Sequence, residues 1–377
     1  MTAQNQTTVA FRRLAVLIVA AALGAVVAAS GEASCSSSSS TPTKIETSHV
    51  PTIRLSNGVE MPSVAAGSCF RDCSKTETNP SGIASNPKFF GFLPEKTYRS
   101  LTLALDMGYT HVDTALVYRS QKQIGAVLAA QFMSGQLRRE DVFITSKLFH
   151  GEMAGLTRRG STLPLDDMTP EEVADAIEGQ FELVLEELGV GYVDVMLLHW
   201  PAIMDSKSEG NAARRLAAWR VLEDMYERGQ ARAIGVSNFS EHHLEQLMAD
   251  GAKILPHVNQ IEASVYKQWD DIKAYCDAKG IALMAYSPLG LGKESLLTDP
   301  VVKSIAEAKG VATSQVALRY LIQKGYAVLP MSSSEERLRL NLDLFGFELS
   351  EAEMEQLEPL AKAKDEGIGL PSPYDMS

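Results

Sequence analysis

Cysteine and clustered basic residues are both scarce in this chain. Only four cysteines occur in 377 residues, which is too few for a scaffold built on disulfide bonds. Lysine and arginine form no dense cluster, and the net charge at pH 7 is −12. Because binding to a phosphate backbone needs grouped cations, we do not expect nucleic acid as a partner.

Two kinds of ligand-binding motif are also missing. The chain contains no C-x-x-C and no H-E-x-x-H, and His242 and His243 are adjacent rather than spaced to share an ion. We therefore expect no metal site. The dinucleotide fingerprint G-x-G-x-x-G is absent as well, which argues against an open, doubly wound sheet.

Residues 1–48 are expected to stand apart from the fold. Arg12 and Arg13 precede an apolar run over 14–29, and small residues and a serine tract follow. This order is typical of a signal peptide, with cleavage near 29–33. The same apolar run is short for a membrane span, yet it would also serve as an uncleaved membrane tether. We interpret the segment as a signal peptide or signal anchor followed by a serine-rich linker.

From residue 49 onward, short β-rich segments alternate with helical patterns. This alternation is typical of βαβ units and a parallel sheet. Eight strands, each followed by a helix, predict an α/β fold, a (β/α)8 TIM barrel spanning 49–377, since an open sheet would stop at about five or six strands. The segment 68–93, which is rich in Gly, Pro, Asn and Ser, the long loop 150–168 and the tail 362–377 are expected to enlarge its mouth.

The expected elements follow one another along the chain. The strands cover 63–67, 110–112, 142–146, 193–198, 231–236, 256–260, 281–285 and 326–330. The helices cover 94–107, 121–133, 170–188, 214–228, 240–249, 268–279, 300–308, 312–323, 334–344 and 350–361. An Asn57-Gly58 turn between extended residues predicts an N-terminal hairpin before the first barrel strand.

Four polar side chains lie at or just beyond three consecutive strand ends: Asp113, Tyr118, Lys147 and His199. Barrels of this kind hold their active site at the C-terminal ends of the strands, so one shared site is expected. A carboxylate keeps a buried lysine charged, and a nearby ammonium lowers the pKa of a phenol from its ordinary value of about 10. Tyr118 then becomes a usable general acid, and His199 can orient the oxygen that is protonated. Such a set suits the reduction of a carbonyl group.

Each of these residues also has an ordinary structural interpretation. An aspartate at a strand end often caps a turn, a tyrosine often lines a wall, and a buried histidine is usually only hydrogen-bonded. Their occurrence on successive strand ends favours the catalytic interpretation. A hydrolase on the same barrel would need two acids flanking a cleft. Asp113 is the single strand-end acid found, and it is expected to pair with Lys147.

The chain resembles the aldo-keto reductase family from about Ile53 to Leu360. The motifs that carry the resemblance are LSNGVEMP (55–62), GYTHVDTA-x-x-Y (108–118), TSK (145–147), LLHWP (197–201), IGVSNF (234–239), VNQ (258–260) and AYSPLG (285–290). The resemblance implies an enzyme of the alcohol dehydrogenase type, which uses NAD(P)H to reduce aldehydes or ketones to alcohols, with Tyr118 giving the proton. Some relatives instead serve as nucleotide-binding regulatory or redox-sensing subunits, an alternative that the complete polar set disfavours.

The resemblance also assigns cofactor contacts. Ser237, Asn238 and Gln260 match the positions that hold the nicotinamide carboxamide, and Tyr286 matches the ring that stacks on the nicotinamide. These residue types suit the tasks, because an amide needs directed donors and acceptors and a flat ring offers a stacking face. Taken alone, Tyr286 would be interpreted as a core aromatic residue.

The remaining cofactor matches concern the pyrophosphate and the adenosine: Ser287, Leu289, Ser332, Arg337 and Asn341. Two residues depart from the family here, since Met331 stands where a lysine is common and Leu340 where a glutamate is usual. The first change removes a cation from the site of the 2′-phosphate, while Arg337 can still bind that group with two hydrogen bonds. We expect NADPH as the cofactor, with NADH as the alternative.

Substrate contacts follow the resemblance less closely. Trp200 is expected to form an apolar pocket wall, and Cys69 or Phe70 stands where relatives often place a pocket tryptophan. Ser120-Gln121 replaces the usual Asn-Glu pair after the catalytic tyrosine. The predicted partner is a small carbonyl compound, and the sequence specifies neither the compound nor the oligomeric state.

The leader predicts the secretory pathway, an organelle lumen or attachment to a membrane. Outside the leader, the one N-glycosylation sequon begins at Asn238, where a glycan would block the expected cofactor site. The sequon must then be skipped, or the compartment lacks the transferase. Cys69 and Cys73 would be able to pair in an oxidising lumen, and their spacing alone does not show that they do.

Overall fold

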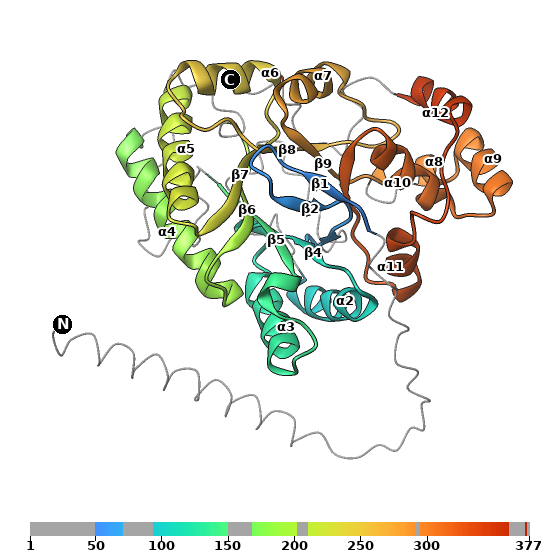
Figure 1. Cartoon of the computed structure of the whole chain (residues 1–377), viewed down its shortest axis with the longest axis horizontal. Helices are drawn as coiled ribbons and strands as arrows, with labels where there is room; N and C mark the ends of the chain where they lie inside the picture. The colour runs from blue at the N-terminus through green and yellow to red at the C-terminus, as the bar shows by residue number, and fades with distance from the viewer. Residues whose placement is uncertain are drawn as a thin grey trace, which may run out of the picture. The chain divides into compact units, whose positions relative to one another are not determined.

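The computed structural model describes residues 50–70, 93–149, 168–201, 210–290, 294–361 and 374. In this part of the chain, strands form a central barrel and helices surround it (Figure 1). The leader 1–48, with its predicted tether at 14–29, lies outside the described residues, as do nearly all of both enlarged loops. Among the helices that are described, none has the length and apolar character needed to cross a bilayer.

Eight parallel strands make the barrel wall, and each pairs with the next along the chain. They are β3 (Ala66–Gly67), β4 (His111–Asp113), β5 (Phe143–Leu148), β6 (Val193–Leu198), β7 (Ala231–Ser237), β8 (Val258–Glu262), β9 (Ala282–Tyr286) and β10 (Tyr326–Leu329). The first and last strands meet through Val64, which bridges Val328, and through Ala65 N, which donates to Val328 O at 2.9 Å. The closed ring confirms the predicted (β/α)8 barrel.

The predicted N-terminal hairpin is also present. It consists of β1 (Thr52–Arg54) and β2 (Glu60–Pro62), which pair antiparallel around a turn in which Gly58 has a φ of 86°. Leu55 and Met61 from the hairpin are fully buried and pack with side chains inside the barrel. Because β2 leads directly into the first barrel strand, the hairpin closes the N-terminal end of the barrel.

Alternate residues of each strand point to opposite sides of the barrel wall. One set forms the apolar barrel interior: Ala65, Phe143, Val195, Leu197, Ala233, Val258, Met284, Ala327 and Leu329. Their sequence neighbours, such as Ile144, Met196 and Ile234, belong to the layer between barrel and helices. This alternation places Asp113, Lys147 and the other polar residues with the same parity on the inner side, above the apolar layer.

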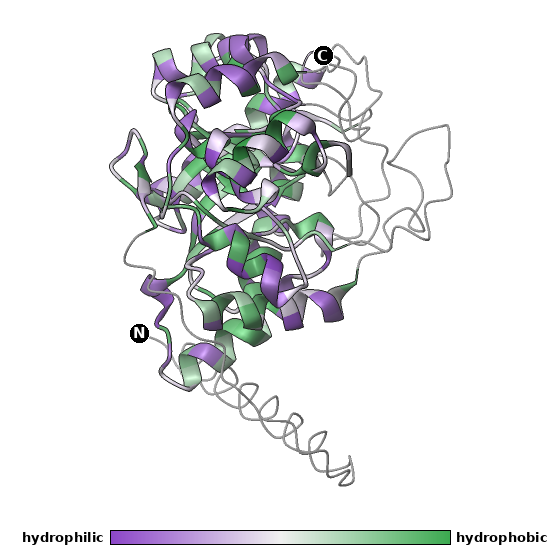
Figure 2. Cartoon of the chain, turned by 90° about the vertical axis from the view of Figure 1, so that its right-hand side faces the viewer, coloured by the Kyte–Doolittle hydropathy of each residue, from purple (hydrophilic) through white to green (hydrophobic). Residues whose placement is uncertain are grey.

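The outer helices are α2 (Pro94–Met107), α3 (Gln121–Met133), α4 (Pro170–Leu188), α5 (Asn211–Glu227), α6 (Glu241–Ala249), α7 (Asp270–Lys279), α8 (Glu294–Leu297), α9 (Pro300–Lys309), α10 (Thr313–Gln323), α11 (Glu335–Leu342) and α12 (Glu351–Leu357). In α4, residues at helical spacing are buried, while the intervening charged residues are mostly exposed. Figure 2 shows the resulting mixture of hydrophilic and hydrophobic residues along the helices. A capping box begins α4: Thr169 Oγ1 accepts from Glu172 N, and Glu172 Oε2 accepts from Thr169 N.

The structure corrects several expected boundaries. The helix expected over 350–361 ends as an α-helix at Leu357, because Pro359 has no backbone N–H to continue the helical hydrogen bonds, and the chain continues as a 3-10 turn. Between the expected strand 281–285 and the expected helix 300–308 lies α8, a single turn too short to show helical periodicity. Strand β4 covers 111–113 rather than 110–112, so Asp113 is its last residue.

A glycine in α3 marks the closest approach between two outer helices. A Cβ added to Gly125 would lie 2.3 Å from Glu187 O of α4, whereas a Cβ added to Gly179, within α4, would meet nothing within 4 Å. We expect Gly125→Ala to lower the free energy of unfolding by about 1–3 kcal/mol through overpacking. Gly179→Ala, the matched control, should raise it by about 0.5–1 kcal/mol through helix propensity. Urea unfolding of both variants checks this, and equal shifts would contradict the predicted clash.

Candidate active site

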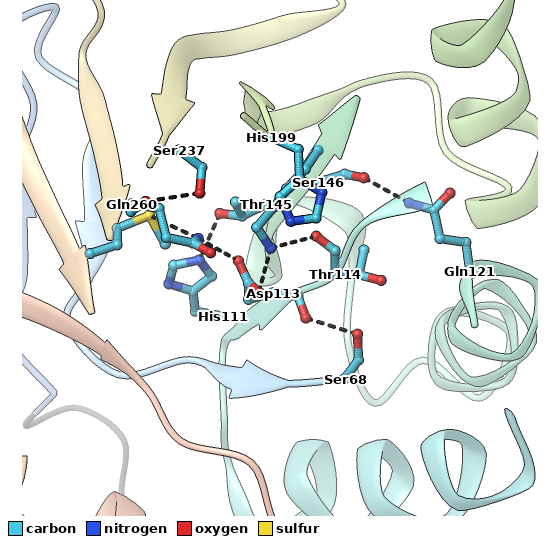
Figure 3. Close-up of polar contacts among 12 residues, drawn as sticks. Ser68, His111, Asp113, Thr114, Gln121, Thr145, Ser146, His199, Ser237 and Gln260 are labelled. Carbon is cyan, nitrogen blue, oxygen red and sulfur yellow. Dashed lines mark hydrogen bonds and ion pairs between the residues drawn. The ribbon is translucent and has the colours of Figure 1, made fainter. Parts of the chain in front are cut away.

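The four predicted polar residues come together at the C-terminal mouth of the barrel. Asp113 ends β4, Lys147 is the penultimate residue of β5, and His199 directly follows β6. Neighbouring strands are in register there, with Asp113 opposite Thr145 and Lys147 opposite Leu197. Parallel pairing therefore brings these strand ends to one edge, as Figure 3 shows.

Asp113 and Lys147 form a buried ion pair. Lys147 Nζ lies 2.7 Å from Asp113 Oδ1 and donates a second hydrogen bond to Thr114 O at 2.9 Å. The other carboxylate oxygen, Oδ2, accepts from Gln260 Nε2 at 2.8 Å. Both charged groups are thus held by hydrogen bonds in addition to their mutual attraction, as a buried pair requires.

Tyr118 lies beside this pair on a short 3-10 turn, η3 (Leu116–Tyr118). Lys147 Nζ is 5.1 Å from the centre of the Tyr118 ring, and the His199 ring is 5.9 Å away in an edge-on arrangement. The four residues predicted to share a site are therefore neighbours. An ammonium at this position favours the ionised form of a phenol, so the arrangement is able to support proton donation.

The segment after β6 carries His199 and two aromatic contacts. His199 N donates to Leu148 O at 2.8 Å, which fixes its backbone to the neighbouring strand. Trp200 is buried and stacks on the His199 ring at 6.3 Å, and Phe149 meets that ring edge-on at 6.5 Å. Trp200 thus lies next to the catalytic set, where a substrate wall was expected, and Phe149 is an aromatic neighbour that no sequence motif indicated.

Phe70 is buried just beyond β3. Its backbone N donates to Ser68 O, and its carbonyl accepts from Leu93 N, both at 3.0 Å. Ser68 in turn donates to Asp113 O at 2.9 Å. These contacts place Phe70 close in sequence to a residue that touches the ion pair, and its contact with substrate stays a prediction.

The residues expected to hold the nicotinamide form one hydrogen-bonded network. Asn238 Nδ2 donates to His199 O and to Ser237 Oγ, each at 3.0 Å, and Asn238 Oδ1 accepts from the Tyr286 hydroxyl at 2.8 Å. Ser237 Oγ donates to Gln260 O at 2.8 Å. Asn238 has a φ of 64°, a left-handed conformation that asparagine tolerates better than most residues. The network joins the ends of β7, β8 and β9 to the segment after β6.

The residues matched to the rest of a dinucleotide lie beyond β9 and β10. Ser287, with a φ of 50°, and the half-buried Leu289 form the turn after β9, in which Gly290 N donates to Ser287 O. The others are Ser332 between β10 and α11, whose Oγ accepts from Ser334 N, and Arg337 and Asn341 in α11. Asn341 is buried, whereas Arg337 is exposed and its guanidinium forms no ion pair with the described residues. These positions are compatible with a bound nucleotide whose phosphate meets Arg337.

Burial determines the protonation state of two residues near the site. It raises the pKa of Tyr286 well above its ordinary value, and the Glu262 carboxylate adds to the increase, so the Tyr286 hydroxyl remains a donor. Burial also lowers the pKa of His111. His111 Nδ1 lies 3.0 Å from Pro62 O, which can only accept, so Nδ1 carries the proton and Nε2 accepts from Thr145 Oγ1 at 2.9 Å. His111 is therefore a neutral structural residue beneath the site.

Metal ligation has no candidate in the part of the chain that the structure describes. No group of three or more His, Cys, Asp or Glu side chains there is arranged to hold an ion. His243 instead accepts a hydrogen bond from Ser240 N through Nδ1, at the start of α6.

The contacts that hold the site together were harder to predict than its reactive groups. Thr114 contributes a backbone carbonyl to Lys147, and Gln121 Nε2 donates to Ser146 Oγ at 2.7 Å. Because every residue has a backbone carbonyl, the residue type at position 114 does not indicate this contact. The pairing of Gln121 with Ser146 would have required the barrel register, although Gln121 already stood out as a departure from the family pattern.

Comparison with known proteins agrees with this geometry. The model of the aldo/keto reductase family matches residues 90–362. A glyoxal reductase of Bacillus subtilis is 34% identical over 330 residues, which cover 88% of this chain and 99% of that protein. An aldose reductase B of Dictyostelium discoideum is 34% identical over 278 residues, covering 69% and 83%.

Solved structures show the same likeness. A Bombyx mori aldo-keto reductase in complex with NADP has a TM-score of 0.66 and 28% identity, covering 83% of this chain and 93% of that one. A second silkworm aldo-keto reductase, complexed with NADPH, has a TM-score of 0.67 and 29% identity, covering 83% and 88%. Barrel, strand-end residues and relatives agree, and the chain belongs to the aldo-keto reductase family.

Proposed function

We propose that this protein reduces aldehydes or ketones to alcohols with NADPH. The observation that carries the proposal is the buried Lys147 ammonium, which lies between the Asp113 carboxylate and the Tyr118 ring. A protein that only bound nucleotide would gain nothing from a buried ion pair beside a phenol. Relatives named as a glyoxal reductase and an aldose reductase support carbonyl reduction of this general type.

The residues that would hold the cofactor fit a dinucleotide. The side chains of Ser237, Asn238 and Gln260 present donors and acceptors on adjacent strand ends, with the Tyr286 ring beside them. Two structural neighbours are complexes with NADP and with NADPH. A reduced nicotinamide supplies hydride to the carbonyl carbon when it is bound.

The remaining chemistry belongs to the chain. Tyr118 donates its phenolic proton to the carbonyl oxygen, which becomes the alcohol oxygen. Lys147 stabilises the phenolate that is left, and Asp113 keeps Lys147 charged and in place. The His199 ring, edge-on to Tyr118, orients the same oxygen, while the stacked Trp200 excludes water from one side. Together these residues supply an acid and a position for it, an activity of the alcohol dehydrogenase type.

Selection of NADPH over NADH is assigned to Arg337. Its guanidinium is exposed near the start of α11, where the segment after β10 ends. Met331, at the position where relatives commonly have lysine, is partly exposed and brings no charge. Arg337 is therefore the cation proposed to meet the 2′-phosphate, through two parallel hydrogen bonds.

For residues 1–48 we propose a signal peptide or signal anchor, which directs the barrel to the secretory pathway, to an organelle lumen or to a membrane. The sequon asparagine, Asn238, is buried in the folded barrel, so a glycan would have to be added before folding. Cys73 lies outside the described residues, so its pairing with Cys69 stays a prediction. N-terminal sequencing of the mature protein determines whether the leader is removed.

Replacing Tyr118 by phenylalanine tests the proposed acid. The ring is retained and the proton is lost, so we expect kcat for an aromatic aldehyde to fall by about 10²–10⁴-fold. NADPH affinity should change little, which fluorescence titration measures. Tyr320→Phe is the matched control, because Tyr320 is a buried tyrosine whose hydroxyl donates to Gln268, and it should keep kcat. Equal kcat values for wild type and Tyr118→Phe would refute the assignment. Nucleotide binding without turnover in the wild type would indicate a regulatory or redox-sensing subunit.

Replacing Arg337 by alanine tests the cofactor preference. We expect Kd for NADPH to rise by about 10–100-fold, corresponding to loss of a charged hydrogen-bonded pair of about 1.5–3 kcal/mol. Kd for NADH should stay nearly constant, because NADH lacks the 2′-phosphate. Arg339→Ala is the control on the same helix, since Arg339 faces Glu335 at 3.5 Å. Wild-type protein that binds both cofactors equally would show that Arg337 does not discriminate between them.

A further inference from the structure

The segment that carries Tyr118 is tied at both ends to consecutive residues of β5. At its start, Thr114 O accepts from Lys147 Nζ at 2.9 Å, and Thr114 N donates to Thr145 O at 2.9 Å. At its end, Gln121 Nε2 donates to Ser146 Oγ at 2.7 Å. Figure 3 shows the bond between Gln121 and Ser146 as a dashed line. The same strand therefore holds the segment and supplies the Lys147 ammonium.

The backbone between these two ties is not a shape that the segment would adopt by itself. After the 3-10 turn that ends at Tyr118, Arg119 has a φ of 52°, in the left-handed region that residues with a side chain seldom occupy. Ser120, at the N-cap position of α3, makes no side-chain capping bond. Such a backbone persists only where surrounding contacts hold it. The Gln121 side chain is one contact that ties the end of this segment to the barrel wall.

The Gln121 side chain is polar although it lies in a buried layer. Gln121 and Ser146 are both fully buried between the barrel wall and α3. The amide oxygen Oε1 of Gln121 has no hydrogen-bond partner in the described part of the chain, so the residue satisfies only part of its polar capacity. An apolar side chain would fill this layer at lower cost, as Ile124 and Leu128 do further along the same helix. The hydrogen bond to Ser146 is therefore the interaction that an apolar residue at position 121 could not make.

We propose that Gln121 and Ser146 are a positioning pair that holds the Tyr118 ring at its distance from Lys147. The proposal rests on the proposed function, because it concerns the residue that donates the proton. Neither side chain reaches the reacting atoms, since Ser146 points away from the barrel interior that Lys147 faces. Displacing an acid by about 1 Å is enough to slow a reaction up to about 100-fold, so a tie at this place affects the rate.

Three variants test the pair: Gln121→Met, Ser146→Ala and the double variant. Ser146→Ala removes only one hydroxyl, so it remains informative if Gln121→Met does not fold. Gln131→Met is the matched control, because Gln131 lies in the same helix, is buried, and donates from Nε2 to Asp106 Oδ1 at 2.9 Å. For each protein, kcat, KM, the Kd for NADPH, the thermal midpoint and the pH profile of kcat are measured.

We expect either single change to lower kcat by about 10-fold while KM and the NADPH Kd stay within about twofold. The double variant should be no slower than the slower single variant, because both changes break the same contact. Gln131→Met should lower the thermal midpoint about as much as Gln121→Met does, because each change removes one buried amide hydrogen bond. It should nevertheless leave kcat within about twofold.

The pH profile separates positioning from stability. Titratable groups near Tyr118 among the described residues include Lys147 of β5, Asp113 of β4 through its pair with Lys147, and His199 after β6. An acid must be protonated to act, so kcat falls as the pH rises past the pKa of the phenol. A ring displaced from the ammonium keeps its proton to higher pH, so the alkaline limb should move upward in Ser146→Ala and Gln121→Met.

An unchanged kcat and an unchanged alkaline limb in Ser146→Ala would overturn the proposal, whatever the thermal midpoint does. So would multiplicative losses in the double variant, because they would show that the two residues act separately. Failure of the proposed function looks different. In that case the wild type does not turn over, or Tyr118→Phe matches it, and the positioning pair falls with the acid it was proposed to hold.

Discussion

The site depends on the buried ion pair between Lys147 and Asp113. Removing an ammonium and a carboxylate from water costs desolvation free energy. Their mutual attraction offsets that free energy only when the geometry is good and further hydrogen bonds are made. Both conditions are met: the pair is separated by 2.7 Å, Lys147 also binds Thr114 O, and Asp113 also binds Gln260. Loss of one partner would leave a buried charge without compensation. The pair is therefore a constraint on the fold as well as a feature of the chemistry.

The barrel stabilises this ion pair because it holds both partners on rigid strands. Parallel register sets Asp113 opposite Thr145, two residues before Lys147, so both charged side chains point inward at the same edge. The apolar layer below them, which includes Phe143, Leu197 and Met284, keeps water from entering from beneath. The hairpin closes the opposite end of the barrel. Hydrophobic packing thus provides the low dielectric in which one ammonium has a strong effect on one phenol.

Most of the barrel was predictable because its sequence signals are local. Helices α2, α3 and α4 have the predicted limits. In α4 the Thr169 cap, Pro170 and the terminal Gly189 all agree with a regular apolar spacing, whereas α3 has neither a side-chain cap nor a terminal glycine. The proximity of Asp113, Tyr118, Lys147 and His199 was also predicted, because strand ends meet at one edge in this fold. The tie between Gln121 and Ser146 was not predicted. It depends on how α3 sits against β5, which a pattern along one chain does not specify. The one-turn helix α8 was missed because four residues do not complete a period.

The side-chain amide of Asn238 connects Ser237 and Tyr286, which are proposed to contact the nicotinamide, to the backbone of His199. Its Nδ2 is committed to His199 O and Ser237 Oγ, and its Oδ1 accepts from Tyr286. These partners fix which end of the amide is oxygen, because a carbonyl can only accept and the buried Tyr286 hydroxyl stays protonated. An amide oxygen has two lone pairs, so Oδ1 retains one acceptor position for an N–H donor. A ligand that occupies that position would bind to a group already connected to the backbone of His199. The same hydrogen bonds would then connect the ligand to His199, the residue proposed to orient the substrate oxygen.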